Sequence, residues 1–146
     1  MAITTAATAN MSIDPITLTV MLNAFDAICS EMTLSLARSA YSPVISVARD
    51  FSCSIYDVRC RQVWMSEALP IHTNSQNLVL QQLQKHFTGK INDGDVFLCN
   101  DPYSGNTHIG DLMVMMPVFH GPGQLFWSVV KAHHQDTGAP LPTSLN

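Results

Sequence analysis

Hydrophobic residues recur at helical spacing over the first third of the chain, between Asp14 and Ser39. One stripe consists of Met21, Phe25, Ile28, Met32 and Leu36. Asp14 and Pro15 predict the start of this helix, because an aspartate accepts N–H bonds at the N-cap and proline suits the first helical position. A second apolar set widens the stripe, so we expect this helix to be covered on more than one side.

Beyond residue 50 the pattern changes to the alternation that is typical of strands. The expected strands cover 51–56, 62–65, 95–100, 112–119 and 124–131, and the first two form a hairpin. Between the second and third strands we expect another helix, capped by Asn74 or Ser75 and ended by Gly89. The fold class that follows is α+β, with two helices packed on a mostly antiparallel sheet.

Length, charge and cysteine content restrict the number of domains, the kinds of partner and the compartment that we expect for this protein. The 146 residues have room for one domain, and residues 1–13 read as a disordered lead-in without the features of a signal peptide. The net charge of −4, with scattered Lys and Arg, argues against a nucleic-acid partner. The apolar runs look too short and too interrupted for a membrane span. Four cysteines without a C-x-x-C pair indicate reduced thiols in a cytoplasmic protein.

A polar loop with the sequence NDPYSGNTHIGD, residues 100–111, separates two apolar strands and contains His108 and Asp111. If the turn at 120–123 joins antiparallel strands, Phe119 faces Gln124 and each opposed pair sums to 243. That register sets Asp111 opposite Ala132 and Gly110 opposite His133, at Cα separations of roughly 4.5–5.5 Å. A bulge at the turn would shift the pairs by one residue and keep His133 beside the loop.

Two imidazoles and a carboxylate at one strand end are a donor set for zinc, manganese or iron. Gly105 and Gly110 allow the loop to fold tightly enough to aim His108 and Asp111 inward. Two simpler interpretations stay open. H-x-x-D is a common pattern, a histidine at a strand end is often only hydrogen-bonded, and the aspartate of the Asp-Pro pair in this loop can serve turn formation alone.

Several motifs in order resemble the hydantoinase B/oxoprolinase family. They are RDFSCSIYD (49–57), NDPYSGNTHIGD (100–111), PVF (117–119) and AHHQDTG (132–138), and the first helix also fits. The resemblance covers about residues 14–146, and it implies the N-terminal, metal-binding portion of a hydantoinase B-like domain. Family chains are several times longer, and the tail after residue 136 shows no closing element. We therefore expect a fragment, a truncated product or one piece of a split subunit.

The resemblance also implies particular site residues. The metal ligands would be Asp50, His108, Asp111 and His133. His134 and Asp136, which we select because they stand next to His133, would orient or deprotonate the attacking water as catalytic residues. His72, in the stretch LPIHTNS, would lie near the substrate, and a hydrogen-bonded loop histidine is an equal alternative for it.

The activity that the resemblance implies is shared between subunits. A hydantoinase A-type partner binds ATP and phosphorylates the substrate, and the B-type component completes the reaction at its metal. The chain contains no G-x-x-x-x-G-K-[ST] sequence, so we expect the partner to bind the ATP. The expected function is a metal-dependent component of an ATP-dependent cyclic-amide hydrolase in a hetero-oligomer, opening a hydantoin, oxoproline or lactam ring. Two alternatives are a biotin-independent ATP-dependent ketone carboxylase and a non-catalytic structural fragment.

Overall fold

The chain forms helices on both faces of one antiparallel sheet in a computed structural model that describes residues 13–66, 70–136 and 138. The helices are α1 (Pro15–Ser39), α2 (Pro43–Ser46), α3 (Pro70–His86) and the short 3-10 helix η1 (Pro102–Ser104). The strands are β1 (Phe51–Asp57), β2 (Gln62–Met65), β3 (Phe97–Cys99), β4 (Asp111–His120) and β5 (Gly123–His133), in the order β2-β1-β5-β4-β3. The expected α+β class is confirmed, with α2 and η1 as additional elements. All but the last residue of the expected lead-in lie outside the described residues, as do residues 139–146 of the tail.

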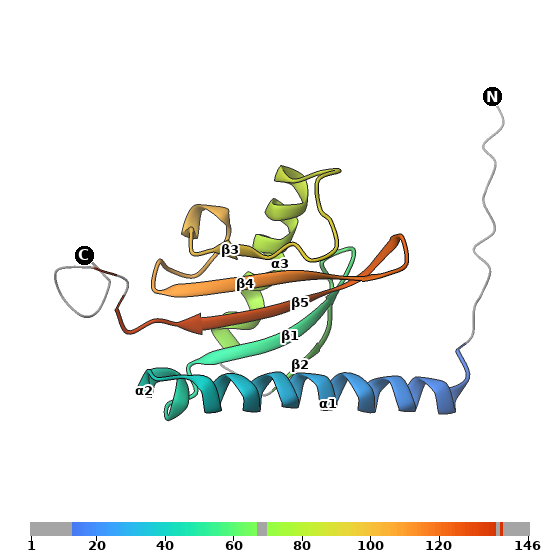
Figure 1. Cartoon of the computed structure of the whole chain (residues 1–146), viewed down its shortest axis with the longest axis horizontal. Helices are drawn as coiled ribbons and strands as arrows, with labels where there is room; N and C mark the ends of the chain where they lie inside the picture. Colours follow the sequence, from blue (N-terminus) through green and yellow to red (C-terminus); the bar gives the residue numbers. More distant parts are fainter. Residues whose placement is uncertain (1–12, 67–69, 137, 139–146) are drawn as a thin grey trace.

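Helix α1 begins where the sequence predicts. The carboxylate of Asp14 accepts a hydrogen bond from the backbone N–H of Thr17 at 3.0 Å, and Pro15 is the first helical residue. The helix runs beneath the sheet along the lower side of the molecule (Figure 1). Only part of it is covered, because Ile16 and Val20 are 74% and 62% exposed. The expectation of cover on more than one side is therefore wrong for the described residues.

Helix α1 also bears on the expectation that no segment spans a membrane. By length and composition α1 is long and apolar enough to cross one. The core helix of a soluble protein or a signal sequence meets the same criterion. The expectation that every apolar segment is too short to span a membrane is therefore wrong for α1. One helix of this kind is weak evidence for a membrane span.

Helix α3 begins at Pro70, one turn before the predicted caps. Proline is favoured in the first turn of a helix because its missing N–H has no helical partner there. The residues taken for caps, Asn74 and Ser75, lie inside the helix, and the Ser75 hydroxyl donates to the carbonyl of His72 at 3.1 Å. Gly89 follows the helix at a positive φ of 71°, as expected of a residue that ends it.

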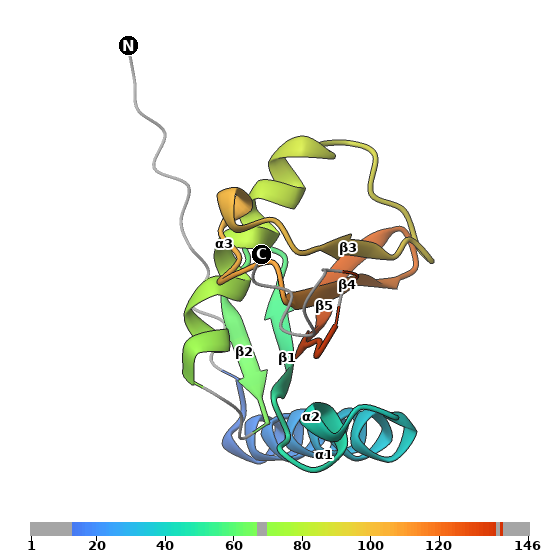
Figure 2. The ribbon, with the colours of Figure 1, turned by 90° about the vertical axis from the view of Figure 1, so that its left-hand side faces the viewer.

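The two faces of the sheet pack against different helices, which Figure 2 shows in an end-on view of α1. The α3 face carries the larger core, formed by Tyr56, Cys60, Val79, Leu80, Leu83, Met113, Met115, Trp127 and Val129. On the α1 face, Phe51, Cys53 and Ala132 are packed with Met32 and Leu36 of the helix. Successive side chains of a strand point to opposite faces of the sheet. In β1, for example, Tyr56 packs on the α3 side and Cys53 on the α1 side. The four cysteines are free thiols, as predicted, and three of them are buried.

The register of the β4–β5 hairpin differs from the prediction by one residue. Phe119 pairs with Gln124 as expected, but a bulge between Val118 and Phe119 shifts every later pair. Asp111 therefore lies opposite His133 rather than Ala132. Because residues opposed in an antiparallel pair point to the same face, the bulge brings these two side chains together on the α3 side.

Candidate metal centre

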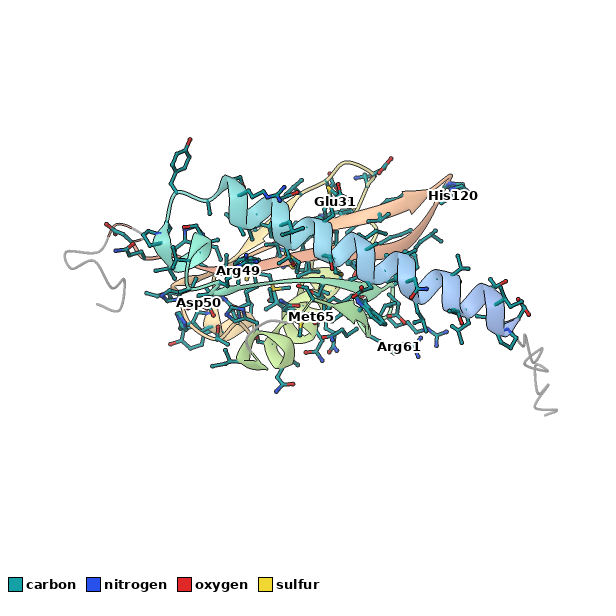
Figure 3. The ribbon with its side chains drawn as sticks, turned by 90° about the horizontal axis from the view of Figure 1, so that it is seen from below. Glu31, Arg49, Asp50, Arg61, Met65 and His120 are labelled. Atoms are coloured by element: carbon teal, nitrogen blue, oxygen red, sulfur yellow. The ribbon has the colours of Figure 1, made fainter. Side chains whose placement is uncertain are left out.

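The candidate site lies at the end of the sheet where β1 and β4 begin and β5 ends. The backbone N–H of His133 donates to the carbonyl of Asp50 at 3.0 Å, and the N–H of His134 donates to the carbonyl of Gly110 at 2.8 Å. These bonds join three segments that are far apart in the sequence. Figure 3 shows Asp50 at this end and His120, in the β4–β5 turn, at the opposite end.

The loop before β4 is held by side chains that bond to its own backbone. Asp101 accepts hydrogen bonds from the N–H of Tyr103 at 3.0 Å and from the hydroxyl of Ser104 at 2.6 Å, which is the turn chemistry that the sequence allowed for this residue. The buried Asn106 donates to the carbonyl of Asp111 at 2.7 Å and to that of His108 at 3.2 Å. The loop therefore presents His108 and Asp111 from a fixed backbone.

His108, Asp111 and His133 form a group that can hold a metal ion. Each offers one donor atom, and all three atoms lie within 4.8 Å of one another. The Oδ1 atom of Asp111 is 3.2 Å from Nε2 of His108 and 3.0 Å from Nδ1 of His133. The carboxylate is buried at 2% exposure, whereas the rings of His108 and His133 are 38% and 25% exposed. The three donor atoms thus lie close together, and the two histidine rings are accessible to solvent.

The surroundings of the three donors fit a divalent metal. Two imidazole nitrogens and one carboxylate oxygen suit zinc, manganese or iron, and three protein ligands leave positions free. The N–H of Gly110 donates to Nδ1 of His108 at 3.1 Å, which orients that ring and places the proton of its neutral form on Nε2, beside Oδ1 of Asp111. A Cβ at Gly110 would stand 3.0 Å from both the His108 and the His133 ring, so only glycine lets the rings approach in this way.

The second oxygen of Asp111 is held by residues that the sequence analysis missed. Oδ2 accepts a hydrogen bond from the Thr107 hydroxyl and lies 3.4 Å from Nζ of Lys131. The fully buried Lys131 also donates to the hydroxyls of Ser75 at 2.7 Å and Thr107 at 2.8 Å. The position of Lys131 in the site could have been predicted, because it lies two residues before His133 on the same face of β5. Nothing in the sequence around Ser75 indicates that it belongs to the site.

These contacts decide the charge of Asp111 and Lys131. Burial raises the pKa of Asp111, but the hydrogen bonds from Thr107 and His133, with the charge of Lys131, more than reverse this and lower it below its usual value. Burial lowers the pKa of Lys131, and Asp111 offsets part of that shift. Lys131 and Asp111 therefore form a buried ion pair, in which Asp111 is also one of the three candidate donors.

His72 and Asp50 lie on the inner side of Asp111. Nε2 of His72 is 3.7 Å from Oδ1 of Asp50 and 3.7 Å from Oδ2 of Asp111, and the His72 ring is 2% exposed. Burial lowers the pKa of His72, which favours the neutral imidazole. Asp50 is outside the three-residue group, and its role as a ligand stays a prediction. The substrate contact expected for His72 likewise stays a prediction.

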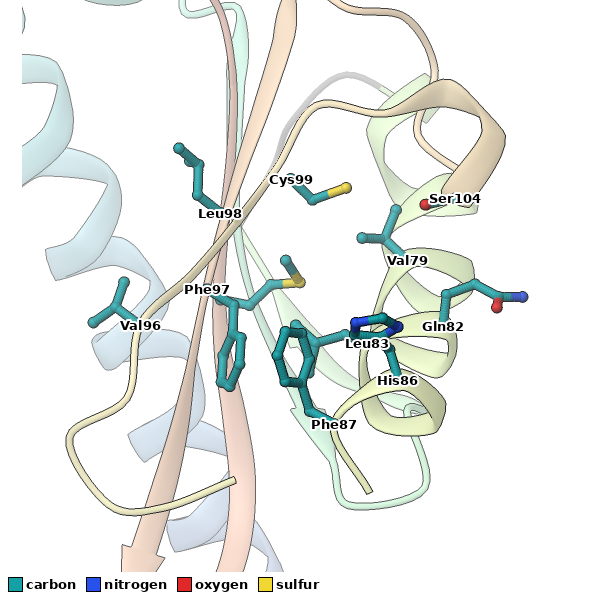
Figure 4. Close-up of a pocket in the computed structure, with 11 residues that line it drawn as sticks. Val79, Gln82, Leu83, His86, Phe87, Val96, Phe97, Leu98, Cys99 and Ser104 are labelled. Atoms are coloured by element: carbon teal, nitrogen blue, oxygen red, sulfur yellow. The ribbon is translucent and has the colours of Figure 1, made fainter. Parts of the chain in front are cut away.

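The residues expected to act on the water follow β5. The His134 side chain is half-buried, and Asp136 is exposed, with its carboxylate accepting from the N–H of Gly138 at 2.8 Å. Their catalytic assignment remains a prediction. A separate pocket of about 500 Å³ lies between α3 and β3 (Figure 4). Leu83 of the helix and Phe87, which follows it, line one side, and Phe97 and Cys99 of the strand line the other. None of the three candidate donors lines it.

The comparisons with known proteins relate the chain to a single family. The sequence pattern of the family described as hydantoinase B/oxoprolinase matches residues 14–146. The caprolactamase subunit beta of Pseudomonas jessenii is 34% identical over 135 residues, which cover 92% of this chain and 23% of that protein. The 5-oxoprolinase of Saccharomyces cerevisiae is 33% identical over 136 residues, 92% of this chain and 11% of the relative. The chain therefore spans about a quarter or less of these relatives.

Solved structures share this fold. The crystal structure of the ATP-dependent caprolactamase from Pseudomonas jessenii superposes with a TM-score of 0.84, over 90% of this chain and 23% of that one. A nucleotide-free structure of acetone carboxylase superposes with a TM-score of 0.81 at 21% identity, over 87% of this chain and 17% of that one. At that identity, the second likeness concerns the fold alone.

Proposed function

The chain belongs to the hydantoinase B/oxoprolinase family, and on that premise we propose that it is the metal-binding part of an ATP-dependent cyclic-amide hydrolase. Caprolactamase and 5-oxoprolinase are named for substrates that are lactams, so the proposed substrate is a lactam or a related ring such as a hydantoin. The proposed partner is an A-type subunit that binds ATP, in a cytoplasmic hetero-oligomer. The relative from Pseudomonas jessenii is itself named as a subunit, which supports a multisubunit enzyme.

The convergence of His108, Asp111 and His133 at one sheet end is the observation that carries the proposal. Zinc, manganese or iron at these donors would supply Lewis acidity and lower the pKa of a bound water towards neutrality. Such an ion is useful for ring opening, because an amide carbonyl is a weak electrophile that needs both activation and a strong nucleophile.

The chain's own residues prepare this chemistry. Asp111 supplies a buried negative charge that stays ionised, because Thr107 and Lys131 stabilise its carboxylate. The partly exposed rings of His108 and His133 border the side from which a substrate enters. His134 and Asp136 follow directly on β5, and we assign them to positioning the water on that open side, with Asp50 as a further ligand.

Metal content tests the proposal first. The purified 146-residue chain should contain or take up about one equivalent of zinc, manganese or iron, measured by mass spectrometry of the elements. His108→Ala should lose it, because two donors hold an ion poorly. His120→Ala is the matched control, since its exposed side chain lies at the opposite end of the sheet. Full metal retention in His108→Ala would contradict the assignment of the site.

Activity tests the substrate class. The chain would be combined with an A-type subunit and ATP, and ring opening of 5-oxoproline, hydantoin and caprolactam would be followed by liquid chromatography. ATP-dependent opening that His108→Ala abolishes would support the hydrolase. Consumption of acetone and bicarbonate instead would favour the carboxylase alternative, and metal binding without either reaction would favour a non-catalytic fragment.

A further inference from the structure

Helix α1 covers only part of its side of the sheet. Phe25 of α1 packs edge-on against Phe126 of β5, with ring centroids 5.5 Å apart, and the hydroxyl of Ser128 on β5 donates to Sδ of Met32 at 3.9 Å. Strands β4 and β3 lie beyond β5 in the sheet, and their side chains on this side stay 38–67% exposed. We define these side chains as the open face: Val96, Leu98, Val114, Met116 and Val118.

The open face is continuous and entirely apolar. Leu98 of β3 pairs with Val114 of β4, and Met116 and Val118 follow at alternate positions of β4. Figure 4 shows Val96 and Leu98 pointing away from α3. A contiguous exposed apolar patch on a folded chain is typical of a surface that binds another protein or a membrane.

Helix α1 carries a second exposed apolar set on the side that faces away from its own sheet. Val20 lies nine residues before the buried Cys29, and at 3.6 residues per turn this spacing puts the two on opposite sides of the helix. We define the exposed residues that share the side of Val20 as the outward stripe: Ile16, Val20, Ala27 and Leu34.

The outward stripe and the open face match in length and spacing. The 25 residues of α1 extend about 37 Å, the 10 residues of β4 extend about 33 Å, and Figure 1 shows the helix running along the strands. Packed helices lie about 8–10 Å apart, which is the width of two strands, so a second helix beside α1 would lie over β4 and β3. On that side α1 presents the exposed Met21 and Ile28, one turn before Phe25 and Met32.

We propose that a second copy of this chain covers the open face in a two-fold symmetric dimer. With the two α1 helices antiparallel and side by side between the two sheets, each outward stripe lies on the open face of the other copy. The contact is self-complementary and closed, because each copy supplies one stripe and one face, as a two-fold interface requires. This inference goes beyond the proposed metal function and does not depend on it.

The area and the charges of these surfaces favour a second copy over a membrane. The exposed apolar parts of the open face, the outward stripe, Met21 and Ile28 amount to about 900 Å² per copy, against about 800 Å² per partner in a standard stable interface. The exposed Glu31 and Arg38 lie in the C-terminal half of α1, and lipid would have to accommodate both charges.

The molar mass of the whole chain in solution tests the dimer. Size-exclusion chromatography with light scattering, at micromolar concentration, should give twice the mass of one chain. Val20→Lys and Met116→Lys should each raise the dissociation constant of the dimer by at least about 30-fold, the loss expected at a hot spot. Ile71→Lys is the matched control, because it changes an exposed apolar residue of α3, on the other side of the sheet, and it should stay dimeric.

A monomeric wild-type chain, or a dimer that both Val20→Lys and Met116→Lys retain, would overturn the inference. So would a monomer that floats with phosphatidylcholine vesicles, which would assign the same surfaces to a membrane. All three changed positions are exposed, circular dichroism monitors folding, and Val118→Lys replaces Met116→Lys if that variant does not fold. Metal content measured on the same samples keeps the two proposals apart, because loss of the dimer should leave it unchanged.

Discussion

Gly110→Ala should damage the candidate metal centre while leaving the backbone undisturbed. Gly110 is not among the described glycines with positive φ, so alanine can adopt its conformation. Its Cβ, however, would stand 3.0 Å from Cε1 and Nδ1 of His108 and from Cε1 of His133. Carbon contacts are most favourable at about 3.5–4.0 Å, so each of the two rings would have to withdraw by about 0.5 Å.

The size of that displacement sets the expected loss of affinity. Metal–ligand distances tolerate about ±0.2 Å, and a change in an outer residue that orients a ligand typically costs about 10–100-fold in affinity. We expect Gly110→Ala to weaken metal binding by about 10–100-fold, which corresponds to about 1.4–2.8 kcal/mol. Overpacking should lower the free energy of unfolding of the metal-free chain by about 1–3 kcal/mol.

Competition with a chromogenic chelator measures the affinity of each variant for zinc. Gly123→Ala is the matched control, because its Cβ would meet only the carbonyl of His120 at 3.9 Å, and it should bind metal like the wild-type chain. Wild-type affinity in a folded Gly110→Ala chain would refute the reasoning that the two rings close on this glycine around a metal.

Two further predictions concern stability. Gly105→Ala should lower the free energy of unfolding in urea by at least about 2 kcal/mol, because the residue has a φ of 101° and the new Cβ would come within 2.7 Å of Leu78; an unchanged midpoint would contradict this. Burial raises the pKa of the Cys60 thiol from 9.0 to about 11, so its contribution to stability is complete below pH 9 and is lost as the pH rises towards 11. Over that interval, the free energy of unfolding in urea should fall less steeply with pH for Cys60→Ala than for the wild-type chain. The difference in slope should be up to about 1.4 kcal/mol per pH unit. Equal slopes for the two chains would contradict the raised pKa of Cys60.

Much of the fold was predictable because its signals are local. The Asp14 cap, the proline at position 15 and the alternation in β1 and β2 each depend on residues within a few positions of one another. A prediction from the sequence failed where a polar residue could either cap a helix or bind a distant side chain. Ser75 reads as a helix cap in the sequence, yet it lies inside α3 and bonds to Lys131.

The sequence by itself determined two long helices, the five strands, their α+β class and the placement of His133 beside the loop that carries His108 and Asp111, but not the short helices α2 and η1. Only the tertiary structure decided the pairing of Asp111 with His133, because the bulge at Val118 that shifts the register has no signal in the alternation of residues. It alone brought Ser75 to Lys131, 56 residues along the chain, and set His72 against the inner oxygen of Asp111. Such contacts depend on how α3 packs across the sheet, and packing between distant segments leaves no local pattern from which to predict it.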